Sequence, residues 1–459
     1  MRAAIACALL IARAATAAPE DGDDIDRIPR DMPRAQTIPT TSTQDRVHLK
    51  IYLEDVVTLG ARRDVDIPFP PPLPYDFQNR TSLDSVIEWR PVRQLKLVLS
   101  DRADLVEQES VALVSNQTLR NELREAYLSW EPFARTYLDA GRINAREGSA
   151  LGFNPTDFFR PRTLVGQASL DPSVLSRNRL GTVMLRAQAI WDGGSVSALY
   201  APRLFAPSAI KSDLLGIDPR LDATNAADRG LAKITWNLGD TSAQALLYLE
   251  SHRSKVGFDL TRPLGQSVIA YAEWAGGYDQ DLIARAIDYG RKTGTLPRDA
   301  PTPIPTQAAR SFHNDLAVGG SLTIAGAVTF NLEYHLHQGG LSRNDWERWF
   351  GAGRDTPALA NELWYIRGYA SDQLEPATKQ QFFLRVAVPK AFVDRLELDG
   401  FAFVSLADGS TLSQVTASYY LSDAWTAAFS ASANLGSARS ERGSFPQFIS
   451  GIVQLVRYL

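Results

Sequence analysis

Cysteine, histidine and long apolar runs are scarce in this sequence, and each shortage excludes a class of protein. The 459 residues include one cysteine and five histidines. The cysteine, Cys7, lies in an N-terminal segment that we expect to be removed, so the mature chain has neither disulfides nor thiolate metal sites. No run of roughly 18 apolar residues is present, which excludes a helical membrane protein. A membrane barrel is not excluded, because only half of each of its strands is apolar.

Signatures of catalysis and cofactor binding are also missing. There is no phosphate-binding loop and no dinucleotide-binding fingerprint. A hydrolase needs a serine beside a histidine, but Ser251 and His252 are neighbours in sequence and point to opposite faces of a strand. His335 and His337 share a face with Glu333 and could bind a metal, although lining a polar lumen is the commoner role of such residues. We therefore expect no enzyme, no cofactor and no metal.

The N-terminus has the pattern of a secretory signal peptide. A positively charged start is followed by an apolar run at 3–12 and a small-x-small cleavage site at 15–17. A disordered alanine-rich tail is the alternative interpretation. Removing residues 1–17 deletes two arginines and no acid, so the formal charge changes from −4 to −6. Such an acidic chain argues against a nucleic-acid partner. Residues 18–45 show no periodicity, and we expect them to form a flexible periplasmic tail.

From residue 46 to the end, apolar and polar residues alternate. Within 46–54, valine, leucine and isoleucine occupy one face and charged residues occupy the other, and the same pattern recurs at 328–337. A period of two suits a strand with one buried face, whereas a helix would turn every second residue away from that face. The sequence predicts eighteen strands, near 46–58, 83–90, 93–101, 122–130, 133–141, 182–191, 194–201, 229–238, 241–251, 254–261, 265–275, 312–324, 327–338, 378–388, 394–407, 410–421, 424–435 and 447–459.

The connections between these strands alternate between short and long. Tight turns, such as Asp192-Gly193-Gly194 and Gly239-Asp240, separate long connections near 60–81, 102–121, 142–181, 202–228, 276–311, 339–377 and 436–445. Short periplasmic turns and long extracellular loops are typical of outer-membrane barrels. A soluble sandwich or propeller also alternates, but it does not explain the signal peptide, this asymmetry and the terminal strand together. We therefore predict an all-β, transmembrane, antiparallel up-and-down barrel of 16–18 strands over 46–459.

The expected function follows from this architecture. Charged side chains on lipid-facing positions are costly, so we assign the charged face to the lumen and the apolar face to the bilayer. A barrel of about 16–18 strands leaves a water-filled lumen unless something plugs it. Two connections, at 278–289 and 344–369, have helical spacing of apolar residues; one could fold inwards, or they could pack on the rim or on a neighbouring protomer. Tryptophans near strand ends suit an interfacial girdle.

One long connection carries a motif. The strand ends in Gly141-Arg142, and Asn154-Pro155-Thr156-Asp157 follows in the loop, where Asn-Pro favours a bend and the aspartate can accept backbone hydrogen bonds. This stretch resembles a broad group of outer-membrane porin-like proteins in which a strand ends in Gly-Arg and the next loop carries Asn-Pro-x-Asp. The layout is also similar to that of alginate-export barrels, which implies an anionic polysaccharide as cargo. The usual Gly-Arg-Gln becomes Gly-Arg-Ile here, with Ile143.

The sequence thus predicts an outer-membrane channel for small hydrophilic, and in one interpretation anionic, solutes. The alternatives are an exporter component for an acidic polysaccharide and a non-transporting barrel such as an adhesin. The channel-lining or mouth candidates are Arg46, His48, Lys50, Arg142, Arg146, Arg160, Arg162, Arg186, Lys233 and Arg385, and the loop motif is Asn154, Pro155 and Asp157. Expected partners are outer-membrane lipid and lipopolysaccharide, the barrel-insertion machinery, a small hydrophilic solute or acidic glycan, and in one arrangement a second copy of the chain.

Overall fold

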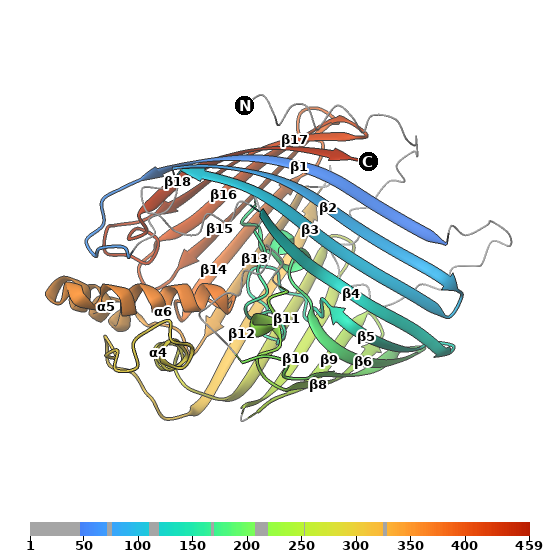
Figure 1. Ribbon diagram of the computed structural model, residues 1–459, viewed down its shortest axis with the longest axis horizontal. Coiled ribbons are helices and arrows are strands. Elements are labelled where there is room, and N and C mark those ends of the chain that lie inside the picture. Colours follow the sequence, from blue (N-terminus) through green and yellow to red (C-terminus); the bar gives the residue numbers. More distant parts are fainter. Residues whose placement is uncertain are drawn as a thin grey trace. The chain divides into compact units, whose positions relative to one another are not determined.

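The computed structural model describes residues 46–70, 76–109, 119–166, 169–206, 219–251, 253–324 and 328–459. The predicted signal peptide at 1–17, the predicted tail at 18–45 and His252 lie outside these ranges. Within them, eighteen antiparallel strands each pair with the next in sequence, and β18 pairs with β1 to close the sheet. The predicted closed barrel and its strand count are confirmed (Figure 1).

The strands are β1 (Val47–Arg62), β2 (Phe77–Val92), β3 (Leu95–Glu109), β4 (Leu119–Phe133), β5 (Thr136–Ile143), β6 (Thr182–Trp191), β7 (Gly194–Ala201), β8 (Arg229–Leu238), β9 (Thr241–Glu250), β10 (Arg253–Leu264), β11 (Val268–Asp279), β12 (Ser311–Ile324), β13 (Val328–His337), β14 (Gln380–Val388), β15 (Leu396–Ser405), β16 (Thr411–Ser422), β17 (Trp425–Leu435) and β18 (Gln447–Tyr458). The helices are α2 (Pro172–Arg177), α3 (Leu221–Thr224), α4 (Leu282–Thr293), α5 (Arg343–Asp355), the 3-10 helix η2 (Pro357–Leu359) and α6 (Ala360–Asp372). No helix in the described ranges is long and apolar enough to span a membrane.

Strands β2, β3 and β4 are longer than predicted. Strand β2 begins at Phe77 rather than near residue 83, and β3 continues to Glu109 rather than ending near 101. The predicted connections near 60–81 and 102–121 therefore contain strand. In the added part of β2, polar residues occupy both faces, with Asn79 and Thr81 on one and Arg80 and Ser82 on the other. Without an apolar face, a strand gives no alternation that sequence analysis can detect.

The barrel has two different ends. At one, the turn end, β2–β3, β4–β5, β6–β7 and β8–β9 are each joined by two residues. At the other, the loop end, lie the long connections, including 144–181, 280–310 and 338–379. The predicted alternation of short and long connections is therefore present in the fold.

The two faces of the wall differ as the alternation predicts. Outward positions carry large exposed apolar side chains, such as Leu49, Leu185 and Leu332, each more than half exposed. Trp89, Trp130 and Trp191 also face outwards, close to the turn end. Inward positions carry buried acids, bases, serines and glutamines, together with an apolar cluster on β6–β9 that includes Met184, Leu231 and Leu246. The sheet has no edge, so every strand has two hydrogen-bonded neighbours, as a membrane barrel requires.

Candidate functional site

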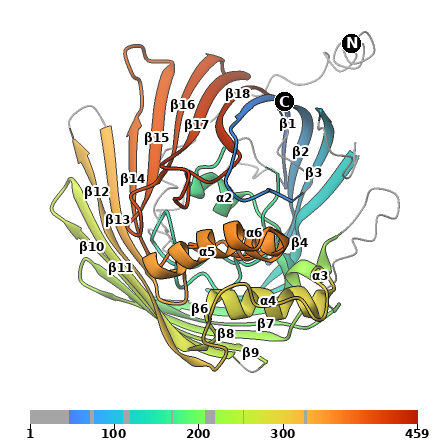
Figure 2. The ribbon, with the colours of Figure 1, turned by 90° about the vertical axis from the view of Figure 1, so that its left-hand side faces the viewer.

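The long connection 144–181, which we name the inner loop, lies inside the barrel. It contains α2, which the end-on view places within the ring of strands (Figure 2). Its side chains and backbone bond to inward residues of strands from β8 to β16. The sequence did not predict this position: two other connections were the candidates for folding inwards. The segment has too few periodic apolar residues to stand out. It is held by polar contacts and by Phe158 and Phe159, which pack against Tyr248 of β9.

Three buried carboxylates on the wall hold the start of the inner loop. Asp259, Glu273 and Glu333 lie on β10, β11 and β13, and each is at most 1% exposed. They accept hydrogen bonds from the backbone N–H groups of four consecutive residues, Ser149–Gly152. A buried carboxylate is tolerated when donors satisfy its oxygens, and each charge-assisted bond contributes about 1.5–3 kcal/mol. We name this arrangement the carboxylate clamp.

Glu333 is the most completely bonded member of the clamp. It accepts from the backbone nitrogens of Leu151 at 2.7 Å and Gly152 at 2.9 Å, and from the Tyr271 hydroxyl at 2.6 Å. The Nε2 of His335 lies 2.7 Å from its second oxygen. Gly152 permits this approach, because a Cβ there would lie 2.6 Å from the ring of Phe383. A side chain at this position would push the inner loop off the wall.

The predicted loop motif forms the next part of the inner loop. Both carboxylate oxygens of Asp157 accept from the guanidinium of Arg179, at 2.6 and 3.0 Å. Asn154 donates to the carbonyl of Glu147 at 2.5 Å, and Pro155 is buried. Glu147 in turn pairs with Lys233 of β8 at 2.7 Å. The motif therefore folds the loop back on itself and ties it to the wall.

The end of the inner loop is tied to a different part of the wall. Asp171, at the N-terminus of α2, lies 3.1 Å from the guanidinium of Arg385 on β14. The backbone nitrogen of Leu170 donates to the side chain of Gln414 on β16 at 3.0 Å. Because its two parts bond to β8–β13 and to β14–β16, the loop crosses the lumen rather than lining one side.

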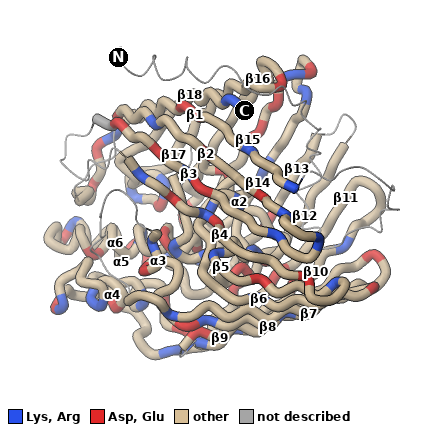
Figure 3. Tube along the Cα trace, turned by 45° about the vertical axis from the view of Figure 1, so that its right-hand side comes forward, with Lys and Arg blue, Asp and Glu red and all other residues tan. Residues whose placement is uncertain are grey.

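The inner wall of β1–β4 is a ladder of buried ion pairs. Arg102 contacts Glu54 at 2.7 Å and Asp104 at 2.9 Å, and Arg80 contacts Glu54 at 3.1 Å. Arg124 pairs with Asp84. Basic and acidic positions are interspersed along these strands (Figure 3). Each cation has an acidic neighbour, so the wall is strongly polar but nearly balanced in charge.

The inner wall of β16–β18 is uncharged. Thr416 and Ser430 are hydrogen-bonded at 2.8 Å, and Ser432 and Ser450 at 2.7 Å. Gln454 reaches across to Glu54 at 2.9 Å, where the ion-pair ladder begins. The lumen therefore presents a hydroxyl-rich sector beside a charged one.

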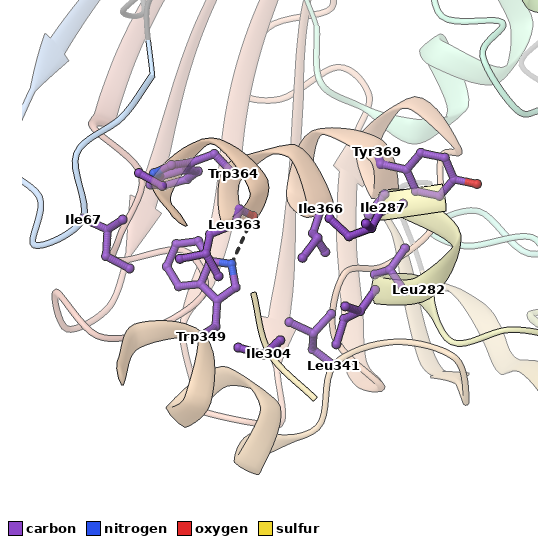
Figure 4. Packing of buried hydrophobic residues seen from close by; sticks show 14 of the residues in the cluster. Ile67, Leu282, Ile287, Ile304, Leu341, Trp349, Leu363, Trp364, Ile366 and Tyr369 are labelled. Carbon is purple, nitrogen blue, oxygen red and sulfur yellow. Dashed lines mark hydrogen bonds between the residues drawn. The ribbon is translucent and has the colours of Figure 1, made fainter. Parts of the chain in front are cut away.

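Helices α4, α5 and α6, which we name the lid, lie across the loop end of the barrel (Figures 1 and 2). They share a hydrophobic core in which Trp349, Leu363, Ile366 and Leu282 are fully buried (Figure 4). The indole of Trp349 donates to the Leu363 carbonyl at 3.1 Å. The helical spacing predicted at 278–289 and 344–369 corresponds to these helices, and they lie at the mouth.

The lid is attached to neighbouring connections through Arg367. Its guanidinium lies 3.9 Å from the ring centre of Phe445 and 4.6 Å from that of Trp364, and it donates to Ser444 at 2.8 Å. Burial lowers the pKa of Arg367, which reflects the unfavourable desolvation of its charge. The faces of the surrounding aromatic rings offset part of that desolvation.

An ionic contact joins the lid to the wall beneath it. Arg285 of α4 pairs with Glu375, just after α6, at 2.6 Å, and the Nε2 of His337 on β13 lies 3.8 Å from the same carboxylate. Burial acts to raise the pKa of Glu375, but Arg285 and His337 outweigh it and hold the pKa below its usual range. In the described ranges, no three acids, histidines or cysteines gather in a way that would hold a metal ion.

The candidate residues predicted from the sequence lie in several environments. Arg46, His48 and Lys50 are exposed near the turn end of β1, and Arg146 is exposed on the inner loop. Arg186, Lys233 and Arg385 face inwards and pair with Asp139, Glu147 and Asp171. Arg142, Arg160 and Arg162 donate to backbone carbonyls of Gly181, Asn154 and Asp222, which organises loops.

The prediction missed the carboxylate clamp and the ladder of β1–β4. Both consist of inward acids and arginines that the alternation had already placed on the polar face. Their partners lie far away in sequence: 182 residues separate Leu151 from Glu333, and 124 separate Ser149 from Glu273. No local pattern identifies such pairs.

When the chain is compared with known proteins, the similar proteins are barrels among the solved structures. No family model and no curated protein matches the sequence. Pseudomonas aeruginosa OccK11 (OpdR) is 11% identical, with a TM-score of 0.48 over 90% of this chain and 96% of that chain. Salmonella typhi OmpF in complex with daunomycin is 10% identical, with a TM-score of 0.42 over 90% and 97%. A mutant Rhodopseudomonas blastica porin is 9% identical, with a TM-score of 0.40 over 90% and 100%.

Proposed function

We propose that this chain is an outer-membrane channel for the passive passage of small hydrophilic solutes. The observation that carries the proposal is a closed eighteen-stranded barrel with an apolar outer face and an inner face rich in charged and hydroxyl-bearing side chains. A bilayer favours this arrangement, because the backbone is fully paired and the apolar side chains meet lipid. A polar lumen of this strand number is a route for water and solutes.

The inner loop favours small solutes over a polysaccharide. It bonds to strands on both sides of the lumen, so a wide cargo would have to displace it. The arginines near the loop end are consistent with a preference for anions, but the inner wall pairs many of its bases with acids. We therefore propose weak anion selectivity, with the inner loop setting the narrowest section.

The test is single-channel recording of the refolded protein in planar bilayers, with the reversal potential measured under a salt gradient. Stable conductance with a small anion-selective reversal potential is the expected result. Protein that inserts into the bilayer but never conducts would overturn the channel proposal and favour a non-transporting barrel. Strong cation selectivity would overturn the proposed preference alone.

A further inference from the structure

The outer face of β1–β4 carries polar side chains that face away from the lumen. Asp55 accepts from the hydroxyl of Thr81 at 2.8 Å and from the amide of Asn79 at 3.3 Å. Asp101 accepts from the amide of Asn121 at 2.8 Å, and Ser85 lies opposite it in the β2–β3 register. We name this set the outer polar patch: Asp55, Asn79, Thr81, Ser85, Asp101 and Asn121.

The register shows that these side chains lie on the outer face. Asp55 stands opposite Leu455 of β18, which is 39% exposed on the apolar surface. The alternate residue, Glu54, is only 6% exposed and lies inside the barrel with Arg102. Because side chains alternate along a strand, Asp55 must point the opposite way from Glu54.

The depth of Asp101, one of the two acids of the patch, makes this acid unfavourable in lipid. Asp101 lies six positions from Leu95, the turn-end residue of β3. A strand crosses the bilayer in about 9–11 residues, so Asp101 lies near the bilayer midplane if the barrel spans a membrane. Acids on the lipid face of a barrel are destabilising at such depths. A protein surface covering the patch would remove this penalty.

The remaining described wall offers no matching surface. On β5–β18, outward positions away from the strand ends carry no acid, and the outward bases Arg142, Arg262 and Arg457 lie at strand ends. A head-to-tail contact would place the patch against an apolar wall. Against itself, however, the patch offers both amide and hydroxyl donors and carboxylate acceptors, so it is complementary to its own copy.

We infer that the β1–β4 face pairs with the same face of a second copy of this chain about a two-fold axis. This inference rests on the proposed membrane placement. Four strands spaced about 4.8 Å apart, over a belt about 25 Å tall, present roughly 500 Å² per copy. Exposed leucines at the edges, Leu59, Leu105 and Leu119, extend this area. The total approaches the roughly 600 Å² per partner at the lower end of specific interfaces.

Disulfide cross-linking in the bilayer tests the inference. Ser85→Cys places a thiol near the centre of the patch, and the described chain contains no other cysteine. Under mild oxidation we expect a reducible dimer, at a level at least several-fold above the control Val318→Cys. Val318 faces outwards on β12, six positions from its turn-end residue, and so matches the depth of the patch.

The outcomes separate this inference from the channel proposal. Protein that fails to float with lipid vesicles contradicts the membrane placement. Protein that inserts and conducts, but cross-links no better at Ser85→Cys than at Val318→Cys, overturns only the dimer. An adduct with a different protein also overturns it. The variant Asp101→Leu provides a second test. If the patch is a dimer interface, the dimer should be lost. If the patch contacts lipid, the protein should remain a monomer and become more stable.

Discussion

The inner loop and the lid both occupy the lumen or its mouth, yet they are held by different combinations of contacts. The inner loop combines many polar contacts with the packing of Phe158 and Phe159 against Tyr248 of the wall. The inner loop is fixed by carboxylates of the wall that accept its backbone N–H groups, and its motif is closed by the Asp157–Arg179 ion pair. The lid is held by a hydrophobic core that has Trp349 and Leu363 at its centre and that also includes Ile67 of the β1–β2 connection. Most residues of the lid core belong to α4, α5 and α6, so we expect the lid to respond as a unit, whereas the inner loop is bonded directly to the wall. We expect the two regions to respond to different changes.

The largest effect is expected from Trp349→Ala. Removing this buried indole should cost the lid about 3–5 kcal/mol, because truncating a buried aromatic leaves a cavity. Faster hydrogen exchange and proteolysis within α4–α6 should follow, while hydrogen exchange in the barrel strands should stay unchanged. If the barrel unfolded together with the lid, the lid would not be an independent unit.

A somewhat smaller effect is expected from Glu333→Gln. The amide keeps one acceptor oxygen and turns an NH₂ group towards N–H donors, so Leu151 or Gly152 loses its partner. A loss of about 3 kcal/mol would release the inner loop roughly 100-fold more often. Single-channel traces should then show frequent steps to a larger conductance.

The matched control for this change is Glu397→Gln. Glu397 is an acid of β15 that bonds to the Tyr420 hydroxyl near the turn end, away from the clamp. Its conductance should equal that of the unmodified protein. Equal traces for all three proteins would show that the clamp does not restrain the inner loop.

Lowering the pH should weaken the ionic contact between the lid and the wall. The pKa of Glu375 is lowered in the folded protein, so its contribution is complete above the unfolded value of about 4.3 and is lost as the pH falls through the lower, folded value. Exchange in α4 and α6 should therefore increase below about pH 4. Glu375→Gln should reduce this dependence, and a variant with an undiminished acid response would exclude the Arg285–Glu375 pair as its source.

The smallest effect is expected from Arg348→Ala. This arginine lies 3.8 Å from Asp345 on the exposed surface of α5, and its side chain is 56% exposed. Exposed pairs contribute about 0–1 kcal/mol, so lid exchange and conductance should both remain within error. A large change would mean that surface charge, rather than the buried core, holds the lid in place.

Local patterns determined the barrel. Period-two alternation placed the eighteen strands, and turn residues such as Gly193 and Gly239, both at positive φ, marked the short connections. These signals depend on neighbouring residues alone, which is why they can be read from one sequence. The extension of β2 was not predicted, because polar residues on both of its faces remove the alternation.

Only the tertiary structure decided which connection enters the lumen and which covers it. Helical spacing identified the segments of the lid, but the same spacing suits a helix inside the barrel or at its mouth. The inner loop has no comparable pattern, and it is held because closure of the sheet brings Asp259, Glu273 and Glu333 around the amides of Ser149–Gly152. These contacts join residues 110 to 182 positions apart. Local sequence determines where each strand forms. The closed sheet determines which groups, distant in sequence, lie close enough to form hydrogen bonds and ion pairs.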